Sequence, residues 1–203
     1  MNQIDRAIGI LKSPQTELVK VKSEQINKID IIRQYIAILA LIPAVAYIIG
    51  MGFVGINVGF VSIKYPIQNA IIGGIFTYIL SIVEVYILGF VINALAPNFA
   101  SKQNEDQAMK LAAYAATAPL VGGIFNIIPM LSFISLIFVL YGFYILYLGI
   151  PILMETPQAN TIAYTIIIIV VTVIISIVIG AFVEAVMAAI NPVPNMMSSI
   201  PYR

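Results

Sequence analysis

The sequence predicts an all-α membrane protein: a five-transmembrane-helix bundle with an amphipathic helical N-terminal arm. Hydrophobic residues make up 61% of the 203 residues and charged residues only 9%, against about 25% charged residues in soluble domains. Five long apolar runs follow the polar start, at about 35–56, 67–95, 111–128, 131–154 and 162–190. Each run is near or above the ~20 residues that a helix needs to cross a bilayer.

Residues 1–33 are the only substantial polar stretch, and we expect them to form a cytoplasmic arm. Apolar residues recur there at helical spacing, first Ile4, Ile8 and Leu11, then Leu18, Val21, Ile29 and Ile32. Between these groups, Ser13 and Pro14 are typical of a helix start, with Ser as the cap and Pro in the first turn. Two interpretations stay open. The second helix lies in the lipid headgroup region, or it packs on the transmembrane bundle.

The first two predicted spans contain proline and glycine residues that affect helix geometry, and one acidic residue within the membrane. The first contains Pro43 and ends in several glycines, which favour close helix approach or a turn. The second has Glu84 near its middle and ends near Asn93. An inner loop at 98–110 follows, and we expect it to face the same side as the arm.

The third span opens with an alanine stripe, and Pro119 should kink it because proline removes one backbone hydrogen bond. Only residues 127–129 separate it from the fourth span, which predicts a tight antiparallel pair. The fifth span is almost all β-branched between 166 and 179. It must nevertheless be a helix, because a single segment in lipid has to satisfy its own backbone hydrogen bonds.

The distribution of Lys and Arg predicts the orientation. With the N-terminus inside, the inner flanks carry Arg6, Lys12, Lys20, Lys22, Lys28, Arg33, Lys102 and Lys110, and the outer flanks carry Lys64 and Arg203. Cytoplasmic loops carry the excess of positive charge, so we expect the N-terminus in the cytoplasm of a cell-membrane protein. Residues 192–203 would then form a short external tail.

Several segments resemble a known family, namely Leu11–Pro14, Asn93–Phe99, Ala113–Pro119, Gly123–Pro129, Leu140–Met154 and Ala163–Thr165. They cover essentially the whole chain in order. On these motifs the chain is similar to the prokaryotic branch of the Yip-one family, named for Ypt/Rab-interacting multi-pass membrane proteins. Asn93 departs from the pattern, since many bacterial relatives carry Asp there.

The resemblance implies a five-helix bundle with a cytoplasmic N-terminal arm, in agreement with the charge distribution. Eukaryotic members of the family bind prenylated small GTPases and act in vesicle traffic and membrane shaping. The resemblance therefore implies a role in organising membranes or recruiting proteins to them.

Eight polar or kink-forming positions are candidates for function: Glu84, Asn93, Tyr114, Pro119, Asn126, Tyr141, Tyr144 and Tyr147. A charged residue at the bilayer centre costs about 2.5–3.5 kcal/mol, so Glu84 is either a proton or cation site or a neutral group bonded to a neighbouring Tyr or Asn. Asn93 and Asn126 lie near helix ends and favour capping. The fourth-span tyrosines form either a polar seam with Tyr114 against the Pro119 kink or ordinary aromatic packing.

Composition limits the functions that remain. The chain has no Cys and no His and a net charge of +1, which excludes the usual zinc sites and His-based triads and gives no basis for nucleic-acid binding. We expect no cofactor, no metal and no enzymatic activity, because the carboxylates are scattered and every Lys lies outside the predicted spans.

Two functions stay in view. The first is a non-enzymatic scaffold or adaptor, or a membrane-organising protein, whose arm and 98–110 loop recruit a cytoplasmic or membrane protein partner at the lipid bilayer. The alternative is a small channel or permease that uses Glu84 and the kinked third span. Five spans are few for a transporter, so the alternative needs a homo-oligomer.

Overall fold

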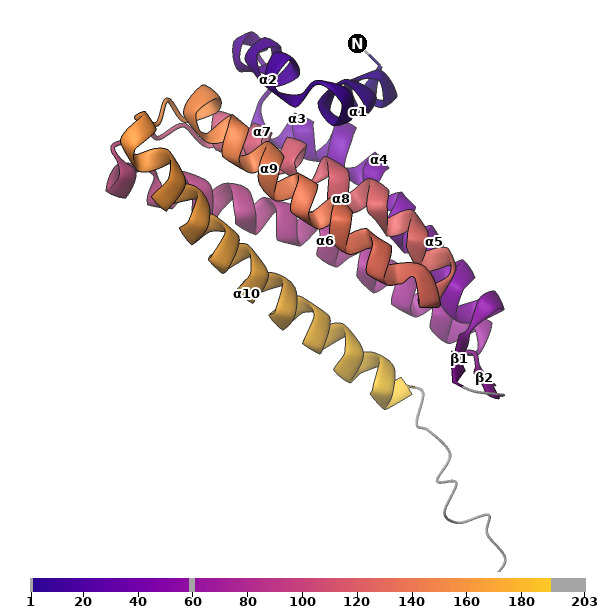
Figure 1. The fold of residues 1–203 in the computed structure, drawn as a ribbon. Coiled ribbons are helices and arrows are strands. Elements are labelled where there is room, and N and C mark those ends of the chain that lie inside the picture. The colour runs from indigo at the N-terminus through magenta and orange to yellow at the C-terminus, as the bar shows by residue number, and fades with distance from the viewer. Residues whose placement is uncertain (1, 59–60, 191–203) are drawn as a thin grey trace, which may run out of the picture.

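The computed structural model describes residues 2–58 and 61–190, which form five long apolar helices, a helical arm and one short β-hairpin (Figure 1). The predicted fold class is confirmed. The long helices run over Lys28–Val54, Ile67–Phe99, Glu105–Ile127, Pro129–Leu153 and Gln158–Ile190. The first and third begin earlier than expected, so residue 33 and residues 105–110 of the predicted inner loop lie in helices, whereas 100–104 connect two helices. The predicted tail at 192–203 lies outside the described residues.

The arm consists of two helices, α1 (Gln3–Lys12) and α2 (Pro14–Ser23). Pro14 occupies the first turn of α2 as predicted, but the side chain of Ser13 makes no capping hydrogen bond. In α1 the residues Ile4 and Ile8 are exposed, whereas Arg6, Ala7 and Ile10 are buried, so it is the latter face that packs in the protein. Helix α2 ends at Ser23 instead of continuing to residue 32, and it packs against the fourth long helix.

The first long helix is built from α3 (Lys28–Ile31), η1 (Ile32–Ile36), α4 (Ala37–Leu39), α5 (Leu41–Ile49) and η2 (Gly50–Val54), and its one proline accounts for one of the breaks. Pro43 has no N–H for the carbonyl four residues earlier, and α4 ends there, at Leu39. Segments η1 and η2 are wider π-helical turns.

A short β-hairpin follows, which the sequence did not predict. Gly55 ends the helix with φ 80°, a left-handed conformation that glycine adopts without strain. Strand β1 (Ile56–Val58) then pairs antiparallel with β2 (Val61–Ile63), with Ile56 opposite Ile63. The hairpin leads into the second long helix, α6 (Ile67–Leu95) with η3 (Ala96–Phe99).

The third and fourth long helices form the tight antiparallel pair that the short connection predicts. The third comprises α7 (Glu105–Ala115), α8 (Thr117–Gly122) and η4 (Gly123–Ile127), and the fourth comprises η5 (Pro129–Ile134) and α9 (Ser135–Leu153). Only Ile128 lies between them. The fifth long helix is the single element α10 (Gln158–Ile190).

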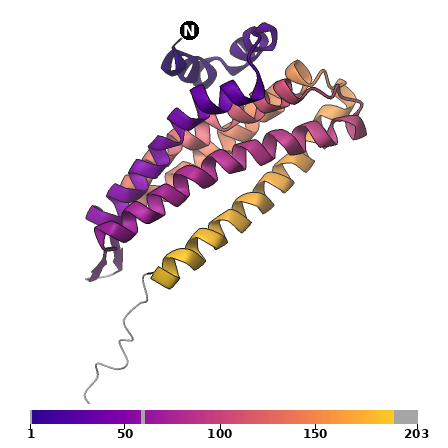
Figure 2. The same ribbon diagram turned by 180° about the vertical axis from the view of Figure 1, so that it is seen from behind.

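The helices pack around α7 and α8, which contact α6, α9 and the first long helix. The arm lies on one flank of this bundle, and α10 lies on the opposite flank against α6 and α9 (Figures 1 and 2). We call the end of the bundle where α7 begins and α9 ends the arm end. The opposite end, with β1, β2 and the last turn of α10, is the hairpin end.

Candidate functional site

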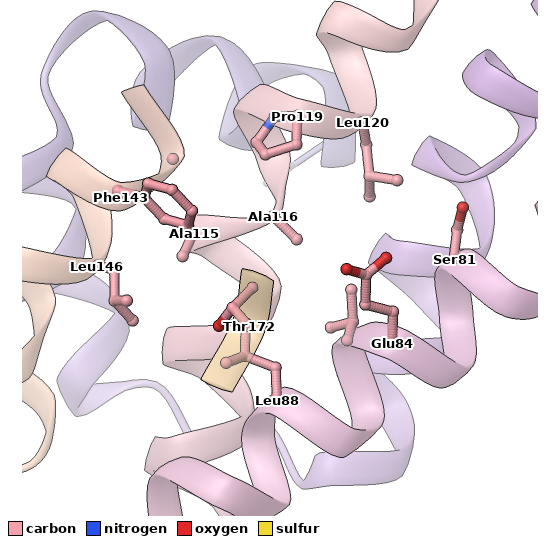
Figure 3. A pocket seen from close by; sticks show the side chains of 12 residues that line it. Ser81, Glu84, Leu88, Ala115, Ala116, Pro119, Leu120, Phe143, Leu146 and Thr172 are labelled. Atoms are coloured by element: carbon pink, nitrogen blue, oxygen red, sulfur yellow. The ribbon is translucent and has the colours of Figure 1, made fainter. Parts of the chain in front are cut away.

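Two of the predicted positions, Glu84 and Pro119, meet at one cavity inside the bundle (Figure 3). The cavity has a volume of about 100 Å³ and lies among α6, α7, α8, α9 and α10. Its lining is mostly apolar; Glu84 is the one charged side chain in it, and Ser81 and Thr172 are the hydroxyl-bearing ones. A mostly apolar cavity of this volume suits one buried polar group better than the passage of a hydrated ion.

The break in the third long helix forms one wall of this cavity. Pro119 has no N–H for the carbonyl of Ala115, and α7 ends at that residue, as the predicted kink requires. Gly142 of α9 lies against the break. A Cβ added to Gly142 would come within 2.8 Å of the Ala115 carbonyl oxygen and 2.9 Å of Pro119 Cδ. The kink and this glycine therefore bring α9 into close contact with the centre of the bundle.

The side chain of Glu84 points from α6 into the cavity, towards Ala116 and Leu120 (Figure 3). Its Oε1 accepts a hydrogen bond from the hydroxyl of Ser176 in α10. The partner is thus a serine, and not the neighbouring Tyr or Asn that the packing interpretation expected. This bond links the buried carboxyl group to the most peripheral helix of the bundle.

The predicted tyrosine seam is absent from the described residues. Tyr144 and Tyr147 are exposed on the outer face of α9, and the residues of α9 that line the cavity are Gly142, Phe143 and Leu146. The buried Tyr114 packs edge-to-face on Tyr35, with ring centroids 5.2 Å apart, and the Tyr35 hydroxyl lies 2.7 Å from Thr117 Oγ1. The structure therefore separates Tyr114 from the fourth-span tyrosines.

Tyr141 agrees with the aromatic-packing interpretation and also contacts the arm. Its hydroxyl donates a hydrogen bond of 2.7 Å to the carbonyl of Leu11, at the end of α1. Its ring lies 5.8 Å from that of Tyr144. Tyr141 thus holds the arm against α9.

Neither asparagine caps a helix with its side chain in the described structure. The Oδ1 atom of Asn93 is buried without a hydrogen-bond partner there, although its backbone carbonyl accepts from Gln103 Nε2 at 3.2 Å. Asn126 lies in η4, where its backbone carbonyl is so close to Gly50 that a Cβ at residue 50 would approach it to 2.1 Å. Asn93 and Asn126 therefore lie at a helix end and at a close backbone contact, respectively, and neither lines the Glu84 cavity.

A second cluster of polar residues lies between the two helices of the arm. Arg6 Nη1 donates to Glu17 Oε2 at 2.9 Å and its Nη2 donates to Glu24 Oε1, and both Arg6 and Glu17 are buried. The hydrogen bond from Lys20, with the charges of Lys20 and Arg6, lowers the pKa of Glu17, although burial opposes the shift. Buried ion pairs of this kind fix the geometry of the two helices relative to each other.

Lys110 joins the arm to the centre of the bundle. It is only 2% exposed, and its ammonium donates to the carbonyl of Val21 at 3.0 Å and to that of Glu24. It is thus a second donor to the Val21 carbonyl, which also accepts from the N–H of Glu24 at 3.3 Å, and a donor to the Glu24 carbonyl beyond the end of α2. Because Lys110 lies in α7, within the third long helix, the expectation that every Lys lies outside the spans is wrong.

Further contacts connect the arm with two connecting segments. Gln107 Nε2 donates to the carbonyl of Lys22 at 3.0 Å, and Lys22 pairs with Glu155 of the α9–α10 connection at 3.1 Å. Lys102 reaches the same Glu155 carboxylate at 3.8 Å. The hydrogen bond from Lys22 and the charge of Lys102 lower the pKa of Glu155. We call residues 2–27, 98–110 and 154–157 together the arm platform.

Sequence reasoning missed Ser176, Lys110 and Glu155. A signal existed for Ser176, because Thr172 and Ser176 recur at an interval of four residues within an otherwise apolar run. For Lys110 the signal was Asn104, whose side chain caps α7 by accepting from the N–H of Gln107 at 3.0 Å. Among the described residues, no group of three or more His, Cys, Asp or Glu could hold a metal ion.

Comparison with known proteins gives one match. A family model described as the Yip1 domain matches residues 8–180. Neither a curated protein nor a solved structure matches the chain. The matched range includes most of the arm, the Glu84 cavity and α10 as far as Gly180.

Proposed function

The chain belongs to the Yip1 family of multi-pass membrane proteins, and from that premise we propose that it is a non-enzymatic scaffold or adaptor. On this proposal the arm platform recruits a cytoplasmic or membrane protein partner at the bilayer surface. The family is one of generally non-enzymatic trafficking membrane proteins, which supports the proposal. Membership of its prokaryotic branch stays a prediction.

The observation that carries the proposal is the way the arm is held. Arg6 joins its two helices to each other, and Lys110 of α7 and Tyr141 of α9 hold it against the bundle. A linker that only connects would have no need of buried charges, which cost free energy unless they are fully paired. A fixed arm presents a defined surface to a partner, and it loses little further entropy on binding.

The outward face of the arm has the composition of a docking surface. Ile4 and Ile8 are 62% and 43% exposed and lie one helical turn apart on α1. Lys12 lies one turn after Ile8 on α1, and Lys20 is an exposed basic residue of α2. We infer that these isoleucines insert into a protein partner or the headgroup region, with the basic groups near acidic groups of the partner or lipid.

The orientation that this function needs follows from the charge count. Eight basic residues on the inner flanks against two on the outer flanks support a cytoplasmic N-terminus. We propose the cell membrane as the location on the same basis.

The test is purification of the tagged full-length chain from its native membranes in mild detergent, with the bound proteins identified by mass spectrometry. Replacing Ile4 and Ile8 together by Glu should remove a near-stoichiometric partner, because two charges then occupy the apolar face. The matched control is Thr16→Glu, which adds a charge at an exposed position of α2. Retention of the partner by the Ile4/Ile8 variant, or recovery of the chain alone as a homo-oligomer, would contradict the adaptor proposal.

A second candidate function is a small oligomeric channel or permease, and one observation favours it. Glu84 and the Pro119 break line the same cavity, as an intramembrane transport site requires. Its test is proton or cation flux into proteoliposomes, with Glu84→Gln expected to abolish it and Glu105→Gln, at an exposed position of α7, as the control. Equal flux in the Glu84 variant and the unchanged chain would remove Glu84 from any transport mechanism.

A further inference from the structure

Two rows of polar residues face each other where α6 and α10 pack together. On α6 the row consists of Thr77, Ser81 and Glu84; on α10 it consists of Thr172, Ser176 and Glu184. Intervals of three, four and eight residues place each row along one face of its helix. Ser176 bonds Glu84 across the interface, which fixes the pairing of the two rows.

A crevice of about 240 Å³ lies between α6 and α10, and its polar lining consists of Thr77, Ser81, Glu84 and Glu184. It adjoins the Glu84 cavity, because Ser81 and Glu84 line both spaces. Gly180 leaves room in its wall: a Cβ added there would meet no atom within 4 Å. The crevice has space for several water molecules, each of which needs about 10–15 Å³ of this kind of volume. Hydroxyl and carboxyl groups along it supply the partners that such waters require.

The crevice leads towards one end of the bundle only. Glu184 lies eight residues beyond Ser176 on α10, a rise of about 12 Å towards the hairpin end. On the arm side of Glu84, the cavity lining consists of apolar groups such as Val85, Leu88 and Leu146, with Thr172 as the last hydroxyl. The polar path therefore begins near Glu184 and stops at Glu84.

The chemistry of the path suits a proton. Glu84 is the one carboxyl group in the cavity, and Glu184 is the one other titratable group in the crevice, since α7, α8 and α9 contribute none to either lining. A metal cation would need several oxygen ligands arranged around it. A proton needs one carboxyl group and a chain of hydroxyls and waters.

We propose that Glu84 is a proton-binding site that exchanges with water at the hairpin end through the polar seam between α6 and α10, and is closed to the arm end. The seam consists of Thr77, Ser81, Glu84, Thr172, Ser176 and Glu184. This inference does not rest on the adaptor proposal, which concerns the opposite end of the molecule. Failure of either leaves the other standing.

The first experiment measures water access by single cysteines, for which the chain is suited because it contains no cysteine. Ser81→Cys and Gly180→Cys place a thiol in the seam; Ile79→Cys and Val178→Cys are the controls, at exposed positions two residues away on the same helices. Each variant is reconstituted into sealed vesicles and treated with a charged, membrane-impermeant thiosulfonate. Cysteines at Lys64 and Lys12 report which end faces the medium.

We expect the seam cysteines to react at least tenfold faster than their controls when the hairpin end faces the medium. When the arm end faces the medium, they should react no faster than the controls. Seam cysteines as slow as the controls in both orientations would mean that lipid fills the crevice, which overturns the proposal. Equal reaction from both ends would overturn the closure at the arm end.

The second experiment follows the proton itself by infrared difference spectroscopy of the reconstituted chain during a change of pH. The carbonyl band of a protonated carboxylic acid should disappear reversibly on alkalinisation, and Glu84→Gln should lack that band. Glu105→Gln, which removes an exposed carboxyl group outside the seam, should keep it. A spectrum that Glu84→Gln leaves unchanged would overturn the assignment of the proton to Glu84.

Discussion

The third and fifth long helices differ in burial, and the difference shows how the bilayer determines which helix lies at the centre of the bundle. In the third, 72% of the most apolar 18-residue window is buried, whereas in the fifth the share is 6%, although the fifth is far richer in isoleucine. In water the most apolar helix would occupy the centre. In a bilayer lipid solvates isoleucine as well as protein does, so small residues that pack closely take the centre instead.

The two helices are also held by different forces. Around α7 the contacts are close backbone approaches and buried polar bonds, such as Lys110 to the arm and Gly142 to the kink. Helix α10 is held by a few separate contacts, among them Tyr164 with Phe99 and Ser176 with Glu84. We therefore expect substitutions around α7 to unfold the bundle, and substitutions on α10 to detach one helix or do nothing.

The largest effect should come from a matched pair of glycines. Gly142→Leu would force a side chain into the Ala115 carbonyl and Pro119, neither of which can move freely. Overpacking of this kind costs about 1–3 kcal/mol, and rigid backbone neighbours place it at the upper end. Gly180→Leu, with nothing within 4 Å, should be neutral. Thermal unfolding in detergent compares them, and equal melting temperatures would contradict the comparison.

A second substitution tests the contact between α7 and the arm. Lys110→Met removes the ammonium that donates to the carbonyls of Val21 and Glu24. The Val21 carbonyl keeps the N–H of Glu24 as a donor, so the main loss is at the part-buried Glu24 carbonyl and costs about 1–3 kcal/mol. The arm should detach, so trypsin should cleave it at Lys12 and Lys20 much faster than in the unchanged chain. The control is Lys102→Met, which removes an exposed ion pair at 3.8 Å and should leave cleavage unchanged.

Most of the helical fold could be predicted from the sequence, because a bilayer leaves an apolar segment few alternatives to a helix. The break after Ala115 also followed from Pro119 alone. The apolar pattern could not show which side of each helix faces protein and which faces lipid. Ile4, Ile8 and the outer tyrosines Tyr144 and Tyr147 look like a core pattern, yet they face outwards.

Of the candidate site, Glu84 could be predicted from the sequence, whereas its partner and the role of Lys110 could not. Glu84 stands out in any sequence because a charge inside the membrane is costly, and its position in a cavity agrees with that. Its partner Ser176 is 92 residues away, and only the packing of α6 on α10 brings them together. Lys110 was placed in a loop because charges surround it, whereas the cap at Asn104 starts the helix six residues earlier.

Acid should loosen the arm while it leaves α10 in place. The pKa of Glu17 is lowered in the folded arm, so its ion pairs stabilise docking above the ordinary carboxyl pKa of about 4.5. That stabilisation is lost as the pH falls through the lowered value. Hydrogen exchange of the arm amides, corrected for the intrinsic effect of pH, should therefore rise below pH ~4.5. In Glu17→Gln it should be fast already at pH 7 and change little with acid, and an unchanged pH profile in that variant would contradict the assignment.

The smallest effect should come from α10. Tyr164→Phe removes the hydroxyl that donates to the carbonyl of Ile92 and keeps the ring stacked on Phe99, so it should cost about 1 kcal/mol. Tyr144→Phe, on the exposed face of α9, is the control and should cost nothing measurable. Hydrogen exchange should locate the change in α10 and the end of α6, with α7 as protected as before. If protection of α7 fell equally, α10 would be part of the cooperative centre, and the contrast between a packed core helix and a loosely held outer one would fail.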